Sequence, residues 1–306
     1  MHPEPLERPS STPALPPVGA TSALMGMVVI WALNFSVAKD ALRDVPPLAF
    51  NALRFPFAAA VVYVALRSRG PLVLPHRRDV GKILAFGILG NVVYQYFFIY
   101  GLAHSRAGTA SLLLAGTPMM TALLSRAFGQ ERPPRRVWLG ALATFLGIGV
   151  VVYSGVGASD ARAQDTALGS VLLLCATLCW ASYTVGSRPI VQRYGSMSAT
   201  AWMLWTGTVG VLLMGLPDLL ALDLTGLTAA TWLAVIYAGA LSIGLAYLFW
   251  HYGVKSIGNT RTSVFSNLVP ALALLIAWIT LGEVPTPGQI AGAAVIIGGV
   301  TLAQLR

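Results

Sequence analysis

Long apolar runs separated by short polar links follow one another along most of the chain. The runs cover residues 21–38, 47–66, 83–102, 107–128, 137–153, 167–186, 198–215, 229–252, 262–281 and 288–303. They approach the ~20 residues that an α-helix needs to cross the hydrocarbon core of a bilayer. None shows the ten-residue alternation of transmembrane β-strands, and helices satisfy their own backbone hydrogen bonds in lipid. The pattern predicts an all-α integral membrane protein with ten transmembrane helices.

Residues 1–20 differ from the rest of the chain. They contain six prolines and no apolar periodicity, which is typical of a disordered segment. They also lack the basic region, short apolar core and cleavage site of a signal peptide. We therefore expect a disordered cytoplasmic tail here.

The composition excludes several classes of function. Of the 306 residues, 56% are hydrophobic and 10% are charged, whereas soluble proteins have about 25% charged residues. Ten spans leave no room for a soluble catalytic or ATP-hydrolysing domain, and the chain lacks metalloprotease, nucleophile-elbow, dinucleotide and Walker motifs. We therefore expect no enzyme, no catalytic residue, no cofactor and no bound metal. Cys175 and Cys179, in one apolar run, are interpreted as packing residues.

The positive charges indicate how the chain lies in the membrane. With the N-terminus inside, 15 of the 20 Lys and Arg residues fall on the cytoplasmic side and four on the outer side. Such an excess is typical of cytoplasmic loops. The net charge of +9 therefore indicates orientation, not a nucleic-acid partner. We expect a multi-pass protein of a bacterial inner membrane with both termini in the cytoplasm, surrounded by lipid and without an obligatory protein partner.

Arg54 lies inside a span, and we expect it to snorkel outward or to bond helix-end carbonyls.

The second half of the chain repeats the first. Matching residues at an offset of 152 include Tyr100 with Tyr252, Gly101 with Gly253, Ser111 with Ser263, and Pro118 with Pro270; Trp31 matches Trp180 at an offset of 149. The repeat predicts five-helix copies at 21–154 and 167–306, joined by an outer linker at 155–166. Because five is odd, the second copy enters the membrane from the opposite side. Inverted repeats of this kind are typical of secondary transporters.

Glycines continue the register, pairing Gly140 with Gly292 and Gly147 with Gly299. Each helix thus carries two glycines seven residues apart on one face. Small residues at such positions let membrane helices approach closely. We interpret these four glycines as packing residues.

Several motifs in the two copies resemble the EamA repeat of the drug/metabolite transporter superfamily. In the first copy they are Ala107-Gly108-Thr109-Ala110-Ser111, Thr117-Pro118, Gly129-Gln130-Glu131 and Leu139-Gly140; in the second they are Leu281-Gly282-Glu283-Val284-Pro285-Thr286, Gln289, Gly292 and Gly298-Gly299-Val300. Within that family the chain is most similar to the YddG-type exporters of aromatic amino acids. The resemblance implies ten helices around a central cavity and export of small metabolites by alternating access.

Polar and aromatic side chains inside the spans are the candidate substrate ligands, because polar groups in hydrocarbon usually face the bundle interior. One helix face combines Asn91, Tyr94, Gln95 and Phe98 at helical spacing, which suits a planar amphipathic ligand. The full candidate set is Trp31, Asn34, Asn91, Tyr94, Gln95, Phe98, Trp180, Tyr183, Tyr247, His251 and Asn267. The alternatives are an interhelical hydrogen bond for Asn34, interfacial anchoring for the aromatics, and an interfacial role for His251.

Two further features concern mechanism. Pro118 and Pro270 occupy equivalent positions and predict a bend in each helix, which we interpret as a pair of gating kinks; static kinks are the alternative. No Asp or Glu lies within the ten spans. This argues against proton-coupled export of cationic drugs, which usually needs an embedded carboxylate. We therefore predict an uncoupled exporter of amino acids, aromatic ones by preference. The alternative is a proton-linked exporter of cationic drugs or other metabolites.

Overall fold

The computed structural model describes residues 18–69, 72–128, 135–155, 165–257, 262 and 265–304, and all elements in these ranges are helices. The predicted tail and linker lie largely outside the described residues. The first half contains α1 (Val18–Ala41), α2 (Pro47–Arg69), α3 (Arg77–Gly87), the π-helix η1 (Ile88–Val93), α4 (Tyr94–Ala103), α5 (Ala107–Leu114), α6 (Thr117–Ala127) and α7 (Arg135–Gly155). The second half contains α8 (Ala167–Tyr194), α9 (Ser196–Ala221), the 3-10 helix η2 (Leu224–Gly226), α10 (Ala229–Ile236), the π-helix η3 (Tyr237–Leu245), α11 (Ala246–Ile257), α13 (Leu268–Leu281) and α14 (Pro287–Gln304).

The helices have the length and composition of membrane spans. Seven helical stretches are long and apolar enough to cross a membrane, and three shorter apolar helices cover Trp138–Ser154, Leu268–Leu281 and Pro287–Leu302. The prediction of an all-α membrane protein is therefore confirmed. Helices from the two halves alternate in the bundle, since α1 packs against α11 and α13, and α2 packs against α9 and η3.

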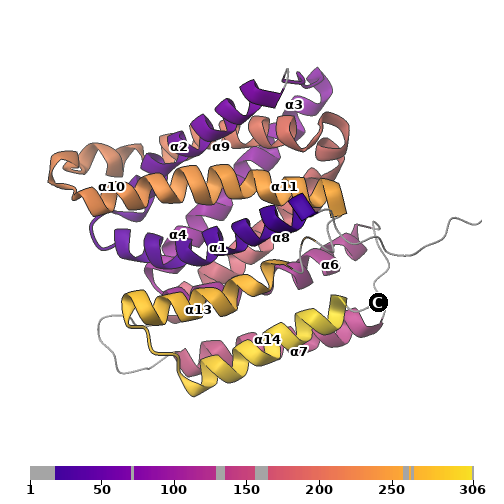
Figure 1. The fold of residues 1–306 in the computed structure, drawn as a ribbon, viewed down its shortest axis with the longest axis vertical. Coiled ribbons are helices and arrows are strands. Elements are labelled where there is room, and N and C mark those ends of the chain that lie inside the picture. The colour runs from indigo at the N-terminus through magenta and orange to yellow at the C-terminus, as the bar shows by residue number, and fades with distance from the viewer. Residues whose placement is uncertain are drawn as a thin grey trace, which may run out of the picture.

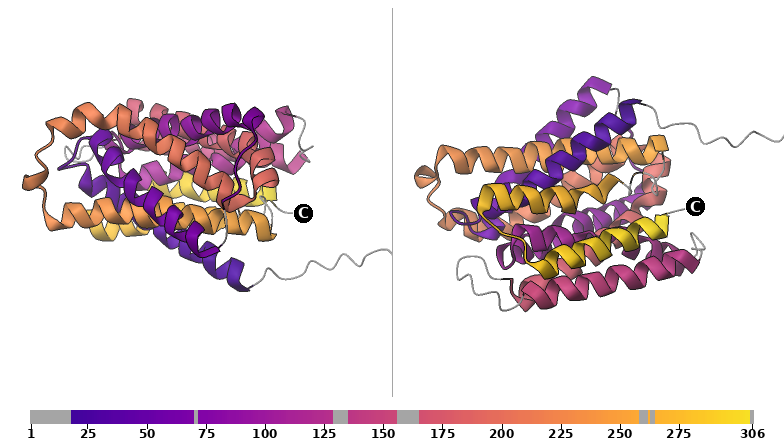
Figure 2. Two further views of the ribbon diagram at one scale, coloured as in Figure 1. Left: turned by 90° about the horizontal axis from the view of Figure 1, so that it is seen from above. Right: turned by 60° about the horizontal axis from the view of Figure 1, so that its bottom comes forward.

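The helix pair α7 and α14 lies at one edge of the bundle (Figures 1 and 2). A Cβ atom added to Gly147 would lie 2.9 Å from the carbonyl oxygen of Gly292, and one added to Gly299 would lie 2.7 Å from that of Gly140. Both distances are too short for a real side chain. The interpretation as packing residues is confirmed for Gly147, Gly292 and Gly299, and Gly140 provides the carbonyl oxygen against which Gly299 packs.

Two π-helical segments interrupt membrane helices, and sequence periodicity did not predict them. Adding the repeat offset of 152 to η1, residues 88–93, gives residues 240–245, which lie within η3. The two interruptions therefore occupy equivalent positions in the two copies. Because a π turn contains an extra residue, it rotates the following helix relative to the preceding one.

The helical structure is interrupted just before each of the two equivalent prolines, and a new helix starts there. Residues 107–127 form α5 and α6, separated at Ala115 and Gly116, and Pro118 lies in the first turn of α6. Likewise Pro270 lies in the first turn of α13, after a turn at Asn267. Proline fits this position because a helix's first turn has no intrahelical acceptor for its N–H groups.

Candidate substrate cavity

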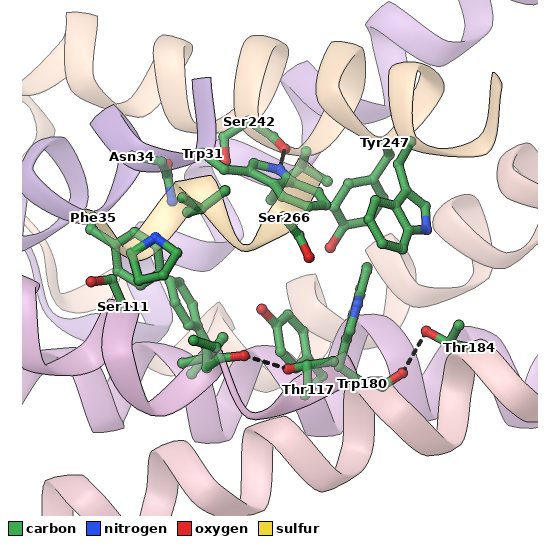
Figure 3. Close-up of a pocket in the computed structure, with 18 of the residues that line it drawn as sticks. Trp31, Asn34, Phe35, Ser111, Thr117, Trp180, Thr184, Ser242, Tyr247 and Ser266 are labelled. Carbon is green, nitrogen blue, oxygen red and sulfur yellow. Dashed lines mark hydrogen bonds between the residues drawn. The ribbon is translucent and has the colours of Figure 1, made fainter. Parts of the chain in front are cut away.

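A cavity of about 130 Å³ lies between helices of both halves of the chain (Figure 3). Helices α1, α2, α4, α5 and α6 contribute from the first half, and α8, η3, α11 and α13 from the second. A water molecule takes up about 30 Å³ in the liquid, so the cavity has room for more than a single water or ion. Its aromatic and aliphatic walls carry a few polar groups, as expected of a small-molecule site.

A continuous series of aromatic rings forms much of the wall. The ring centroids of Tyr94 and Trp180 lie 4.9 Å apart, and those of Trp180 and Tyr247 lie 5.3 Å apart. The series continues through Trp31 on one side, 6.3 Å from Tyr247, and through Phe98 on the other, 5.8 Å from Tyr94. Trp180 and Tyr247 both point toward the central space in Figure 3. Such rings offer large, rigid contact surfaces for a planar or apolar ligand group.

Trp31 is fixed in place and leaves Asn34 beside it. The indole Nε1 of Trp31 donates to the carbonyl oxygen of Ser242, at 3.0 Å, which joins α1 to η3. Asn34 lines the same cavity, and its buried Oδ1 atom has no hydrogen-bond partner among the described residues. A buried acceptor without a partner is costly. Asn34 can therefore accept a hydrogen bond from a ligand without breaking one inside the protein.

Arg54 is the one cationic side chain among the cavity-lining residues that the structure describes. Its Nε and Nη2 atoms donate to Oδ1 of Asn51, at 3.0 and 2.7 Å, and Nη2 also donates to Oε1 of Gln95, at 2.7 Å. The side chain is only 1% exposed. The expectation that Arg54 snorkels or bonds helix-end carbonyls is therefore wrong, because the amides of α2 and α4 hold its guanidinium inside the bundle.

Most of the residues singled out in the sequence meet at this cavity. Those that line it are Trp31, Asn34, Tyr94, Gln95, Phe98, Trp180, Tyr247, Pro118 and Pro270. Sequence reasoning did not select Arg54, or the hydroxyl groups of Ser111, Thr117, Thr121, Thr184, Ser242 and Ser266. Small hydroxyl side chains inside apolar helices carry no distinctive signal, since they commonly bond their own backbone, as Thr184 does to Trp180.

Four of the candidate residues do not line the cavity. Asn91 lies in η1 and donates to the carbonyl oxygens of Gly87 and Met203, at 3.2 and 3.1 Å, because the π-helix turns it away from Tyr94. Tyr183 is buried behind Trp180. A ring nitrogen of His251 lies 2.7 Å from the carbonyl oxygen of Tyr247. This histidine is buried in the bundle. Asn267 precedes α13 next to the lining residue Ser266.

At one end of the bundle, Glu283 joins the two halves of the chain. Its Oε1 and Oε2 atoms accept hydrogen bonds from the backbone N–H groups of Ala107 and Gly108, at 3.0 and 3.1 Å. These N–H groups begin α5 and lack intrahelical acceptors, and a carboxylate is favourable at a helix N-terminus. The Gly-Glu motif at 282–283 thus caps a helix of the other copy. Its counterpart Glu131 lies outside the described residues.

Comparison with known proteins agrees with this architecture. The sequence profile of the EamA-like transporter family matches twice, at residues 19–153 and 167–305. The chain is 30% identical to the "Probable terminal-alkyne amino-acid exporter" of Streptantibioticus cattleyicolor, covering 94% of each chain. It is 28% identical to the "Probable amino-acid metabolite efflux pump" of Salmonella typhimurium, covering 90% of this chain and 91% of that one.

A solved crystal structure has the same fold. It superimposes with a TM-score of 0.66 and 22% sequence identity, covering 93% of this chain and 96% of the other. The similarity therefore extends over nearly the whole bundle. Because the family profile matches both halves of the chain, the protein belongs to the EamA-like transporter family.

Proposed function

We propose that this protein is a secondary transporter that exports amino acids, aromatic ones by preference, through the cavity between its two copies. The observation that carries the proposal is the cavity wall, in which aromatic rings from both halves surround a few polar groups. The names of the two relatives, an amino-acid exporter and an amino-acid metabolite efflux pump, support the substrate class.

The proposed mechanism is alternating access by two inverted five-helix copies, 21–154 and 167–306, with ten membrane spans. The seven long and three shorter apolar helices support this number of spans. The start of α1 and the end of α14 lie at the same end of the bundle in Figure 1, which is consistent with an even number of crossings and both termini in the cytoplasm. Binding near the interface of two such copies is the usual arrangement in secondary transporters.

The proposed transport is uncoupled, so that substrate runs down its own gradient. Among the described residues, those that line the cavity include no Asp or Glu. The buried His251 does not line the cavity either. A proton and a cationic drug therefore have no shared carboxylate to compete for, which disfavours proton-linked drug export.

The test is uptake of labelled phenylalanine, threonine and a cationic drug into proteoliposomes, with and without an imposed pH gradient. We expect saturable amino-acid uptake that ignores the pH gradient and is lost in Trp180→Ala and Tyr94→Ala. Trp138→Ala is the matched control, because Trp138 is 47% exposed on α7 and does not line the cavity. Uptake of the drug alone, driven by the gradient, would overturn the proposal.

A further inference from the structure

Arg54 lies where a charge is costly. It is on α2, seven residues and therefore about 10 Å along the helix from its first residue. Its side chain is buried and also reaches the cavity wall. Ionisable residues inside membrane segments are expensive and usually serve a function.

No acidic side chain among the described residues neutralises this charge. The ion pairs within the described ranges join Arg43 to Asp40 and Arg193 to Asp79. The partners of Arg54 are instead two neutral amides, Asn51 and Gln95. They accept three of the five N–H bonds of the guanidinium. Among the described residues, no group accepts a hydrogen bond from Nη1.

The fold does not require an arginine at this position. Residue 54 corresponds to Met203 in the second copy, at the same offset of 149 that relates Trp31 to Trp180. The backbone contacts are equivalent as well. A Cβ atom on Gly239 would lie against the carbonyl oxygen of Arg54, and one on the equivalent Gly87 would lie 2.8 Å from that of Met203. Methionine therefore fills the equivalent packing position without a charge.

We propose that Arg54 binds the carboxylate group of the transported substrate through its free Nη1 edge. A guanidinium matches a carboxylate in both charge and planar geometry, and such charge-assisted hydrogen bonds are strong in a site that excludes water. The ligand would supply the missing counter-charge. This inference rests on the proposed transport function and narrows its substrates to carboxylates.

The position of Arg54 also orients the substrate. Its guanidinium carbon lies 5.9 Å from the ring centroid of Phe98, and the ring of Phe98 stacks on Tyr94 at 5.8 Å. Tyr94 in turn begins the series that leads to Trp180 and Tyr247. A substrate with its carboxylate at Arg54 therefore lays its apolar side chain on these rings. Amines without a carboxylate would leave the guanidinium unpaired and bind poorly.

The first experiment uses the wild-type protein and four ligands that differ in one group. Unlabelled phenylalanine, 3-phenylpropanoate, phenylalanine amide and 2-phenylethylamine compete with labelled phenylalanine uptake into proteoliposomes. We expect phenylalanine and 3-phenylpropanoate to compete, and the two ligands without a carboxylate to compete about 10- to 100-fold less well, the effect of one charge-assisted contact. Equal competition by all four would overturn the assignment of Arg54.

The second experiment uses Arg54→Met, which copies the second repeat, and Arg54→Lys, which keeps the charge without the planar fork. Arg54→Met should raise the KM for phenylalanine about 10- to 100-fold and abolish the preference for carboxylates, with Arg54→Lys between it and wild type. The control is Arg43→Met, because the Arg43 side chain is 66% exposed and does not line the cavity. An unchanged KM in Arg54→Met would overturn the inference while leaving the transport function in place.

Other outcomes separate the two proposals. In a separate assay, uptake of labelled 3-phenylpropanoate but of no labelled amino acid would retain the role of Arg54 and overturn amino-acid export. Failure of all four ligands to compete would overturn both. If Arg54→Met does not give a folded, monodisperse protein, the wild-type competition series decides the question by itself.

Discussion

Replacing Glu283 by alanine tests how the two halves of the chain are held together. The substitution leaves the N–H groups of Ala107 and Gly108 without their acceptors and removes a buried negative charge from the start of α5. A buried donor without a partner costs about 1–3 kcal/mol. Because both N–H groups are buried, we expect a total loss of about 2–6 kcal/mol.

The assay heats the protein in detergent and measures the fraction that remains monodisperse. This readout is used because membrane proteins of this size commonly unfold irreversibly. For a chain of 306 residues, this loss lowers the expected unfolding midpoint of Glu283→Ala by about 3–9 °C. Glu283→Gln keeps one acceptor oxygen and should lie between alanine and wild type. The matched control is Asp40→Ala, since Asp40 is 59% exposed and its pair with Arg43 is a surface pair. Midpoints for Glu283→Ala and Asp40→Ala that agree within about 1 °C would refute the reasoning.

Three further substitutions address the cavity and its helices. Gly239→Ala should abolish transport and lower stability, because its Cβ would overlap the backbone of Arg54, whereas Gly149→Ala, with open space around it, should have little effect in the same uptake and melting assays. Pro270→Ala should slow phenylalanine transport without changing binding if the kink is a gate, and transport at the wild-type rate would contradict that role. Asn34→Ala should raise the KM for phenylalanine. It should leave the melting midpoint unchanged, because the Oδ1 atom of Asn34 has no hydrogen-bond partner to lose. A lowered midpoint with an unchanged KM would indicate a structural role.

The sequence predicted those features that depend on a residue's own chemistry or on its spacing from nearby residues. Apolar runs predicted the helices, because a span must bury or expose to lipid nearly every side chain. The aromatic residues Trp31, Tyr94 and Trp180 were selected because they lie within apolar runs near other polar or aromatic residues at helical spacing, and all three line the cavity. The repeat offset then predicted that such residues from both copies would meet.

The remaining features depend on contacts between distant segments. Asn91 shares a helical face with Tyr94 only if the helix is regular, and the π turn of η1 between them breaks that register. Arg54 looks the same in sequence whether it snorkels or is buried. Its environment depends on Gln95, which comes from another helix 41 residues away. Local periodicity contains no information on such a partner.

The pairing of Arg54 with Met203 predicts that the transporter binds its substrate unequally from its two sides. The described cavity reaches Arg54 but not Met203. If the two copies exchange conformations during transport, the opposite state opens the cavity toward Met203, and the substrate carboxylate loses its counter-charge. The states then differ in affinity. A passive carrier must have the same ratio of Vmax to KM on both sides, because equal concentrations give no net flux.

We therefore expect both the KM and the Vmax for phenylalanine to be lower on one side of the membrane than on the other, measured in inside-out and right-side-out vesicles. Arg54→Met makes the two copies alike at this position and should bring the two KM values together by raising the lower one. Equal KM values in the wild type would mean that Arg54 stays with the substrate in both states, and the exchange of conformations would then have to leave α2 and its guanidinium in place.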